Sequence, residues 1–461
     1  MPRAHRSETA SEPSQPEHGH PSPARPSLGH PSPARPSFGH PSPGLLTVED
    51  WQSHVLAAFS RSDSETQPLA RVLGRTLAAD VRTRHAVPLF DNSSMDGYAV
   101  RFADLRGATA ARPVELKVVG DVMAGSAANP PIPEGGAVRV MTGAPVPFEA
   151  DAIVPVEDTV EHQNASGWVT PTDPSPLVHV TAEPVPGRYI RREGEDAAEG
   201  TVVLAAGRVL TPRALAAVAA AGHDEVLVTR RPRVAVISTG SELAPAGVRP
   251  ERGMIPDSNT VLLRGLVETQ GGVVVERALV GDDAVALSNL LDALDPHEVD
   301  VVVMTGGVSA GAFDVVKQVL TGVRSVTFAR LAMQPGKPQA FGRLSSGIRV
   351  FGLPGNPVSA AVSFELFVRP ALATLSGRIE VLRPVVDGTA AAGWASPPGR
   401  RQYMPVRVDM TARGLAVRPS AVGGSGSHLV ASLADADGLA IVAAEATEVR
   451  PDDPVGVILF A

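Results

Sequence analysis

The stretch "VDVVVMTGGVSAGAFDVVKQVL" (residues 299–320) joins a continuous apolar run to a helical pattern through a glycine-rich turn. Two further segments have the same design, "RVAVISTGSEL" (233–243) and "RVFGLPGNPVSAAVSFELF" (349–367). Strands that are apolar throughout and alternate with helices are typical of a parallel sheet covered on both faces. We therefore predict an α/β, doubly wound domain over residues 233–379.

The glycine turns of these units are predicted to share one edge of the sheet. In doubly wound sheets, ligands bind at the loops that follow the carboxyl ends of the strands. Glycine lets the backbone approach a ligand, and the N-terminus of a following helix attracts anions. The spacing matches neither the dinucleotide fingerprint nor the P-loop, so it indicates a phosphate or similar oxyanion without identifying it. A purely structural turn is the alternative for any single glycine. Asn356 is also a candidate N-cap, which would leave the next backbone amides free to bind an anion. The candidate ligand-binding residues are Thr305, Gly306, Gly307, Ser309, Pro354, Gly355 and Asn356.

Acidic side chains follow the same predicted strand ends, at Glu242, Asp282, Asp283 and Asp314. A carboxylate 4 Å from an anionic oxygen costs roughly 4 kcal/mol at an effective dielectric near 20. A divalent cation with oxygen ligands, Mg²⁺ first, would cancel this repulsion, with Glu242 and Asp314 as its candidate ligands. The alternative is that some of these acids are helix N-caps or solvated strand ends.

Elsewhere the pattern changes along the chain. Thr47 precedes apolar residues at helical spacing, and Thr211 precedes a proline and then a helical pattern, so each is predicted to cap an amphipathic helix. Short alternating runs broken by Gly and Pro over about 86–182 predict a β-rich domain. Strand-like alternation after about residue 380 predicts a small β-barrel or sandwich.

Composition excludes several classes of protein. The chain has 49 acidic and 41 basic residues without a basic run, which argues against nucleic acid as a partner. No window has the roughly 18 apolar residues of a membrane span, and no secretory signal is present, so we expect a cytoplasmic protein that binds no membrane. Without cysteine, any metal must bind oxygen or imidazole. The repeats of "GHPSPARPS" within residues 1–44 predict a disordered tail, with a histidine metal site as the alternative.

Seven segments, in order, resemble the motifs of one known family. They are similar to those of the molybdopterin molybdenumtransferases, which are the MoeA proteins and their eukaryotic relative, the gephyrin E domain. The resemblance covers residues 45–461. The segments are "FDNSSMDGYAVR" (90–101), "VRVMTGAPVP" (138–147), "IRREGED" (190–196), "STGSEL" (238–243), "MTGGVSAGAFD" (304–314), "PGKP" (335–338) and "GLPGNPVSA" (352–360).

This resemblance implies a homodimeric, Mg²⁺-dependent enzyme that inserts molybdate into adenylylated molybdopterin and releases AMP. An upstream molybdopterin adenylyltransferase is a candidate partner. The implied parts are an elongated helical-linker domain (45–87 and 183–232), an inserted β-rich domain (88–182), the molybdopterin-binding α/β domain (233–379) and a C-terminal β-barrel-like domain (380–461).

In dimers of this family, the active site lies between the α/β domain of one subunit and the first two domains of the other. The resemblance therefore implies that Asp96, Thr142 and Asp196 lie opposite Glu242, Asp282 and Asp314. Lys337 would supply positive charge to phosphate or molybdate. Arg191 and Arg192 are weaker candidates for this charge, and a solvated linker face is the alternative for both.

The sequence departs from the family pattern at three positions. The family often has two lysines before "PGKP", where this chain has Arg330 and Gln334. Ser241 stands where an acid is common. The predicted anion site therefore has one cation fewer than in some relatives.

Two other functions remain open at this point. A molybdopterin adenylyltransferase would use a similar α/β domain with the same "TGGVS" type of loop, but it should need that domain alone. A non-catalytic scaffold, a role that the gephyrin relative also has, would use the repeat tail as a docking segment. Adenylylation without molybdate would favour the first, and loss of a partner on truncation to residue 45 would favour the second.

Overall fold

The computed structural model describes residues 44–161, 177–307, 315–323, 325–412, 414–421 and 426–460. The predicted repeat tail lies outside the described residues except for Gly44, as do Ser309 and Asp314 among the predicted site residues.

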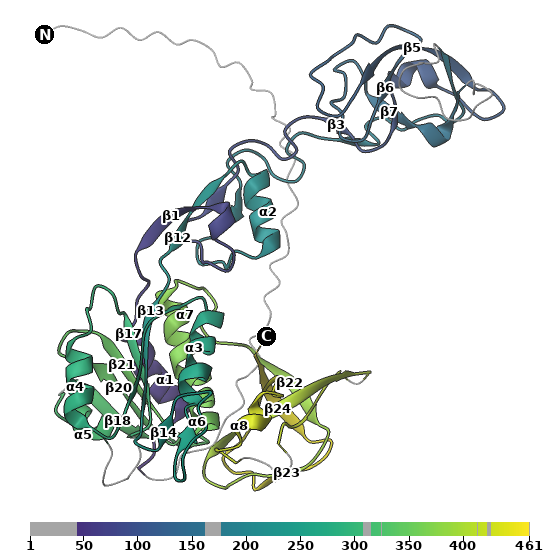
Figure 1. Ribbon diagram of the computed structural model, residues 1–461. Helices are drawn as coiled ribbons and strands as arrows, with labels where there is room; N and C mark the ends of the chain where they lie inside the picture. The colour runs from purple at the N-terminus through teal and green to yellow at the C-terminus, as the bar shows by residue number, and fades with distance from the viewer. Residues whose placement is uncertain are drawn as a thin grey trace, which may run out of the picture. The chain divides into compact units, whose positions relative to one another are not determined.

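The α/β domain contains a six-stranded sheet (Figure 1). Its first four strands are parallel, and the three glycine-turn units are neighbours at its centre, as predicted. The last two strands form an antiparallel extension, because β20 runs opposite to both of its neighbours. The strands, in order across the sheet, are β16 (Val273–Val280), β13 (Arg233–Thr239), β17 (Val301–Thr305), β21 (Arg349–Leu353), β20 (Pro338–Arg343) and β18 (Val326–Arg330).

Helices cover both faces of this sheet, which confirms the doubly wound prediction. On one face, Leu287, Leu291 and Leu320 pack against the strand residues Ile237 and Val302. Figure 1 shows α4 and α5 on this face and α1, α3, α6 and α7 on the other. The helices are α3 (Asn259–Thr269), α4 (Ala284–Asp292), α5 (Val315–Thr321), α6 (Pro357–Ser363) and α7 (Arg369–Leu375), with the π-helical turn η4 (Phe364–Val368) between the last two.

The helix run from α6 through α7 is long and apolar enough to cross a membrane by length and composition. It spans Pro357–Leu375, and 89% of it is buried inside the protein. Such burial is what the core helix of a globular domain shows, so the run gives no support to a membrane span.

The first helix, α1 (Val48–Leu56), begins where predicted, because the Thr47 hydroxyl accepts a hydrogen bond from the Asp50 N–H at 3.0 Å. Its Gln52 side chain donates to the Leu366 carbonyl at 2.8 Å, and α1 lies against α7. The predicted boundaries group residues 45–87 with the linker, whereas α1 packs on the α/β domain and its Glu49 pairs with Arg401 of β24.

The linker is built from two short antiparallel pairs and one helix. Its core contains Val72, Leu77, Leu210, Val218 and Val228. Helix α2 begins at Thr211 as predicted, since its hydroxyl accepts from the Ala214 N–H at 3.2 Å. The elements are β1 (Ser64–Pro68) paired with β12 (Glu225–Thr229), β2 (Val81–Arg82) paired with β11 (Val202–Leu204), η1 (Leu69–Arg71) and α2 (Pro212–Ala220).

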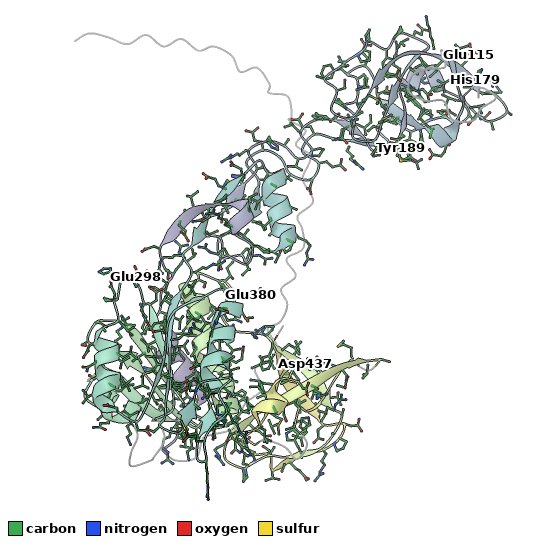
Figure 2. The ribbon with its side chains drawn as sticks, in the orientation of Figure 1. Glu115, His179, Tyr189, Glu298, Glu380 and Asp437 are labelled. Carbon is green, nitrogen blue, oxygen red and sulfur yellow. The ribbon has the colours of Figure 1, made fainter. Side chains whose placement is uncertain are left out.

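The inserted domain is β-rich, as predicted, and has one open six-stranded sheet. Glu115 and His179, labelled in Figure 2, are partners on the neighbouring strands β5 and β9. The His179 Nε2 is 3.2 Å from the Glu115 Oε2. In order, the strands are β7 (Ala152–Pro155), β4 (Gly97–Val100), β6 (Gly136–Val140), β5 (Val114–Val122), β9 (Leu177–Val180) and β8 (Thr159–Glu161), with the short turns η2 (Phe102–Leu105) and η3 (Val156–Asp158).

The C-terminal domain is a closed barrel, which decides between the two predicted forms. Its strands follow the order β24, β25, β22, β28 and β26, and β26 then pairs back with β24. The barrel strands are β22 (Val385–Ala390), β24 (Arg401–Thr411), β25 (Gly414–Pro419), β26 (Gly438–Val442) and β28 (Pro454–Leu459). The smaller elements are β19 (Met333–Gln334), which pairs with β24, β23 (Trp394–Ala395), β27 (Glu448–Val449) and α8 (Val430–Leu433).

Candidate functional site

The glycine turns after β13, β17 and β21 meet at one edge of the sheet. The strands end in register, since Thr305 pairs with Ser238 and with the last residue of β21. A Cβ atom on Gly306 would lie 2.4 Å from the Thr239 carbonyl oxygen, and one on Gly355 would lie 3.3 Å from the Gly306 Cα. Gly306 also has a φ of +92°. The prediction of a shared edge is therefore confirmed, and these turns require glycine to pack together.

A chain of hydroxyl groups lies beneath the turns. The Ser238 Oγ is 2.8 Å from the Thr260 Oγ1 and 3.1 Å from the Thr305 Oγ1, and Thr239 donates to the Thr305 carbonyl. Thr305 is only 1% exposed. Its side chain therefore supports the turn from below, and only the backbone that follows it, at Gly306 and Gly307, stays available to a ligand.

Asn259, the first residue of α3, was not predicted as a site residue. Its Nδ2 donates to the Gly355 carbonyl at 2.7 Å, which fixes the orientation of the amide because a carbonyl can only accept. Its Oδ1 is buried and has no partner among the described residues, although the residue is only 7% exposed. A buried acceptor without a partner costs about 1–3 kcal/mol, so the sheet edge holds an acceptor ready for a ligand donor. In the sequence, "DSN" (257–259) indicates only an ordinary helix start.

The acids at this edge have different environments. Asp283 caps α4, as the alternative reading allowed, since its side chain accepts from the Val285 and Ala286 N–H groups. Asp282 accepts from the Ser241 N–H at 3.1 Å, and its own N–H donates to the Ser241 Oγ at 2.9 Å. This reciprocal pair ties the turn after β13 to the turn after β16.

Glu242 is exposed, and its carboxylate has no hydrogen-bond or ion-pair partner within the described ranges. A Cβ atom on Gly240 would lie 2.5 Å from its Oε2, so the carboxylate lies over this glycine. Among the described residues, no group of three His, Asp or Glu side chains is arranged to hold a metal. Magnesium commonly needs only one or two protein carboxylates, because water and substrate phosphates complete its shell. The free Glu242 carboxylate and the nearby Asp282 turn therefore fit a Mg²⁺ ion bound together with a phosphate.

Asn356 stands at the N-cap position of α6, but its side chain makes no cap hydrogen bond. It donates instead to the Ser427 Oγ at 2.9 Å, and the Val358 N–H donates to the Ser427 carbonyl at 3.1 Å. The prediction of free amides here is wrong for Val358, because a loop of the C-terminal domain takes that N–H. Pro354 is buried below the turn, and Gly355 is exposed.

Lys337 is half-buried, and its ammonium has no partner in the part of the chain that the structure describes. The loop before it is held by Gln339, whose Nε2 donates to the Gly336 carbonyl and to the Ser363 Oγ, both at 2.7 Å. Arg330 is exposed, whereas the Gln334 Oε1 is buried without a partner. Lys337 is therefore a cation without a partner among the described residues, on a loop whose backbone Gln339 holds.

A second group of predicted residues comes together on the inserted domain. The Asp96 Oδ1 accepts hydrogen bonds from the Thr142 N–H at 2.7 Å and from the Thr142 hydroxyl at 2.9 Å. The motif at 90–101 also pairs with the motif at 190–196 through β3 (Asn92–Ser93) and β10 (Ile190–Arg191). The structure thus assembles three separate motifs around an exposed carboxylate.

Arg192 forms an ion pair with Asp91 at 2.6 Å. Burial alone would raise the pKa of Asp91, but the hydrogen bonds from the Glu193 N–H and from Arg192 lower it below its ordinary value. Arg192 is therefore paired within the chain. Arg191 and Asp196 are both exposed, and Asp196 is held through its backbone N–H to the Val87 carbonyl.

Three models of known protein families together match nearly all of the described chain. Residues 46–222 match the MoeA N-terminal region (domain I and II), residues 235–374 match a probable molybdopterin binding domain, and residues 387–460 match the MoeA C-terminal region (domain IV). The three matches follow one another in the order expected from the seven motifs.

Individual relatives match over most of their length. Molybdopterin molybdenumtransferase 2 of Mycobacterium tuberculosis is 42% identical over 390 residues, which cover 83% of this chain and 92% of that protein. The molybdopterin molybdenumtransferase of Staphylococcus aureus is 32% identical over 86% of this chain and 90% of that protein. Two crystal structures of molybdopterin biosynthesis MoeA proteins from Pyrococcus horikoshii superpose with TM-scores of 0.71 and 0.74. Their identities are 32% and 28%, each over 90% of this chain and over 99% and 100% of theirs. The chain therefore belongs to the MoeA family of molybdopterin molybdenumtransferases.

Proposed function

We propose that this protein inserts molybdate into adenylylated molybdopterin and releases AMP, as a cytoplasmic step of molybdenum cofactor biosynthesis. The observation that carries the proposal is the meeting of the Gly306 and Gly355 turns at the sheet edge, where a methyl group on Gly306 would not fit. Backbone placed this closely offers its N–H groups to a phosphate or oxyanion at short range. The family membership supplies the substrate class.

Asn259 would contribute recognition rather than charge. Because its Nδ2 is held by Gly355, its Oδ1 can only accept a hydrogen bond. The oxygens of a phosphoanhydride and of molybdate carry no proton at neutral pH, so they can only accept and cannot satisfy it. A donor of the pterin or of the ribose can, and we assign Asn259 to one of these groups of adenylylated molybdopterin.

Mg²⁺ would be held by Glu242, with Asp314 as its second predicted ligand and Asp282 beside it. When bound, it would neutralise phosphate charge that the carboxylates would otherwise repel. Lys337 would supply positive charge to the oxyanion. Proximity and fixed charge would then supply the catalysis, without a nucleophilic side chain.

The Asp96 group would complete the site from a second copy of the chain. Asp96, Thr142 and Asp196 are on the first two domains, and the homodimer would place them opposite the sheet edge of the partner subunit. The exposed Asp96 carboxylate, fixed by two hydrogen bonds from Thr142, supports this role because it is oriented before any ligand arrives. The adenylylated substrate would come from an upstream molybdopterin adenylyltransferase.

The test is AMP release from adenylylated molybdopterin by the purified protein, with and without molybdate and Mg²⁺. We expect release only when both are present. AMP release that is equally fast with and without molybdate would contradict the proposal. Adenylylation of molybdopterin from ATP would instead identify an adenylyltransferase, although the matches on both sides of the α/β domain favour the transferase of molybdenum.

A further inference from the structure

A pocket lined by arginine lies away from the glycine turns. It is open to solvent and encloses a volume of about 10 Å³, and Arg75, Thr229, Arg230, Arg231 and Arg378 are part of its lining. These residues come from the linker loop after η1, from the end of β12, from the segment that leads into β13 and from the loop after α7. We refer to it as the arginine pocket.

The charge of this pocket is only partly compensated. Arg75 pairs with Glu65 at 2.6 Å, and Arg230 makes two hydrogen bonds to Asp300 at 2.9 Å each. Arg231 and Arg378 have no carboxylate within ion-pair distance in the described residues. The lining itself contains four arginines and no acid, so the pocket carries an excess of positive charge.

The pocket also gathers polar atoms that lack partners. Among the described residues, seven buried side-chain nitrogen or oxygen atoms have no hydrogen-bond partner. Three of them belong to this lining: the Arg75 Nε, the Thr229 Oγ1 and the Arg378 Nε. Thr229 is only 2% exposed and Arg75 only 8% exposed. Buried donors without acceptors are rare in native proteins, and their concentration in one pocket indicates an absent acceptor.

The charge of Arg378 is not compensated within the described residues, which also indicates that an anion is absent from the pocket. Its Nη2 donates to the Gln270 carbonyl at 2.8 Å, which leaves the cation with a neutral acceptor only. Burial lowers the pKa of Arg378, and the positive charges of Arg369 and Arg383 lower it further. An anion in the pocket would remove this cost.

We propose that the arginine pocket binds one small tetrahedral oxyanion, such as phosphate, sulfate or molybdate. Guanidinium groups and a hydroxyl are donors suited to such an ion, and the enclosed volume of about 10 Å³ leaves no room for a larger organic ligand. Bound there, the ion would join Arg75 and Thr229 of the linker to Arg378 of the α/β domain. The proposal does not depend on the proposed enzymatic function.

Calorimetric titration of the full chain with sulfate in chloride buffer of constant ionic strength tests this site. We expect one saturable sulfate site per chain that survives Lys337→Met, a change at the glycine-turn site. Thr229→Val and Arg378→Met should weaken it about tenfold or more. The control is Arg264→Met, which removes a surface arginine paired with Glu268 and should bind like the wild type.

Thr229→Val is the deciding variant, because it removes a hydroxyl that makes no hydrogen bond in the protein and should leave the ion-free fold as stable as before. Sulfate stabilises many proteins without binding, so the thermal midpoint of the wild type should rise more than that of Thr229→Val. Repeating the titration with phosphate and molybdate decides between a general oxyanion site and a selective one. Absence of saturable binding of all three ions, or unchanged sulfate binding by Thr229→Val, would overturn the proposal.

Discussion

Gly306 is the residue at which the sheet edge tolerates least change. Its φ of +92° costs any other residue about 1–2 kcal/mol, and a Cβ atom would also lie 2.4 Å from the Thr239 carbonyl oxygen. Gly347 has nearly the same φ, +89°, but open space around it. We predict that Gly306→Ala lowers the thermal midpoint clearly more than Gly347→Ala does, and that it alone impairs substrate binding. Equal effects in calorimetry would show that the close packing of the turns has no role.

At Asp96, a substitution can remove the negative charge of the side chain and keep its hydrogen bonds from Thr142. An asparagine at this position can still accept from the Thr142 N–H and hydroxyl, which lie 2.7 and 2.9 Å from the present oxygen. We predict that Asp96→Asn keeps the unfolding midpoint within about 2 °C but reduces molybdate-dependent AMP release by about 100-fold or more. Thr142→Ser, which keeps the hydroxyl, is the matched control and should retain most activity. A fully active Asp96→Asn protein would remove Asp96 from the mechanism.

The sequence predicted which residue types lie at the sheet edge, but it did not predict what each side chain does there. Asp282 and Asp283 are adjacent acids, and only coordinates show that one ties two turns together while the other caps a helix. Asn259 escaped prediction because an amide carries no charge and "DSN" is an ordinary helix start. Its importance comes from Gly355, a residue 96 positions away along the chain.

At the scale of secondary structure, Asp300 connects three strand ends. It accepts from the side chain of Arg230 after β12 and from the Arg233 N–H at the start of β13. Burial alone would raise the pKa of Asp300, but these hydrogen bonds lower it below the ordinary value of 3.8. Because the folded state then binds its proton more weakly than the unfolded state, this stabilisation is complete above pH 3.8 and is lost as the pH falls through the lowered value.

We therefore predict that Asp300→Asn destabilises the protein by about 1.5–3 kcal/mol at neutral pH. The difference between variant and wild type should shrink as the pH falls below 3.8, which thermal unfolding across pH would detect. Glu298→Gln is the control, since Glu298 (Figure 2) is 71% exposed and 3.5 Å from Arg233. It should change the stability by less than about 1 kcal/mol. A pH-independent loss in Asp300→Asn would contradict the assignment.

The elements themselves were predictable where local chemistry decides them. Thr47 and Thr211 cap their helices because each places a hydroxyl three residues before a free N–H. The antiparallel strands β18 and β20 were not predicted, because direction in a sheet depends on which strands become neighbours. The surface on which α1 packs was not predicted for a similar reason, since an apolar helix face indicates burial without identifying the surface that buries it.

For the whole molecule, the question is whether one chain suffices for activity. The Asp96 group and the Glu242 turn are on different domains, and the homodimer proposal makes each active site from both subunits. If so, Asp96→Asn and Glu242→Gln proteins should each be inactive as homodimers. Their mixed dimer contains one site with both changes and one site with neither, as two-fold symmetry requires.

We predict that unfolding and refolding the two inactive proteins together restores activity. With random assortment, half of the dimers are mixed and each has one intact site, so AMP release should recover to about a quarter of the wild-type value. Each variant refolded alone is the control and should stay inactive. If one chain forms the whole site, every chain in the mixture carries a defect, and no activity returns. Recovery that increases with the fraction of mixed dimers, measured by differently tagged chains, would place the two carboxylates on opposite subunits of one site.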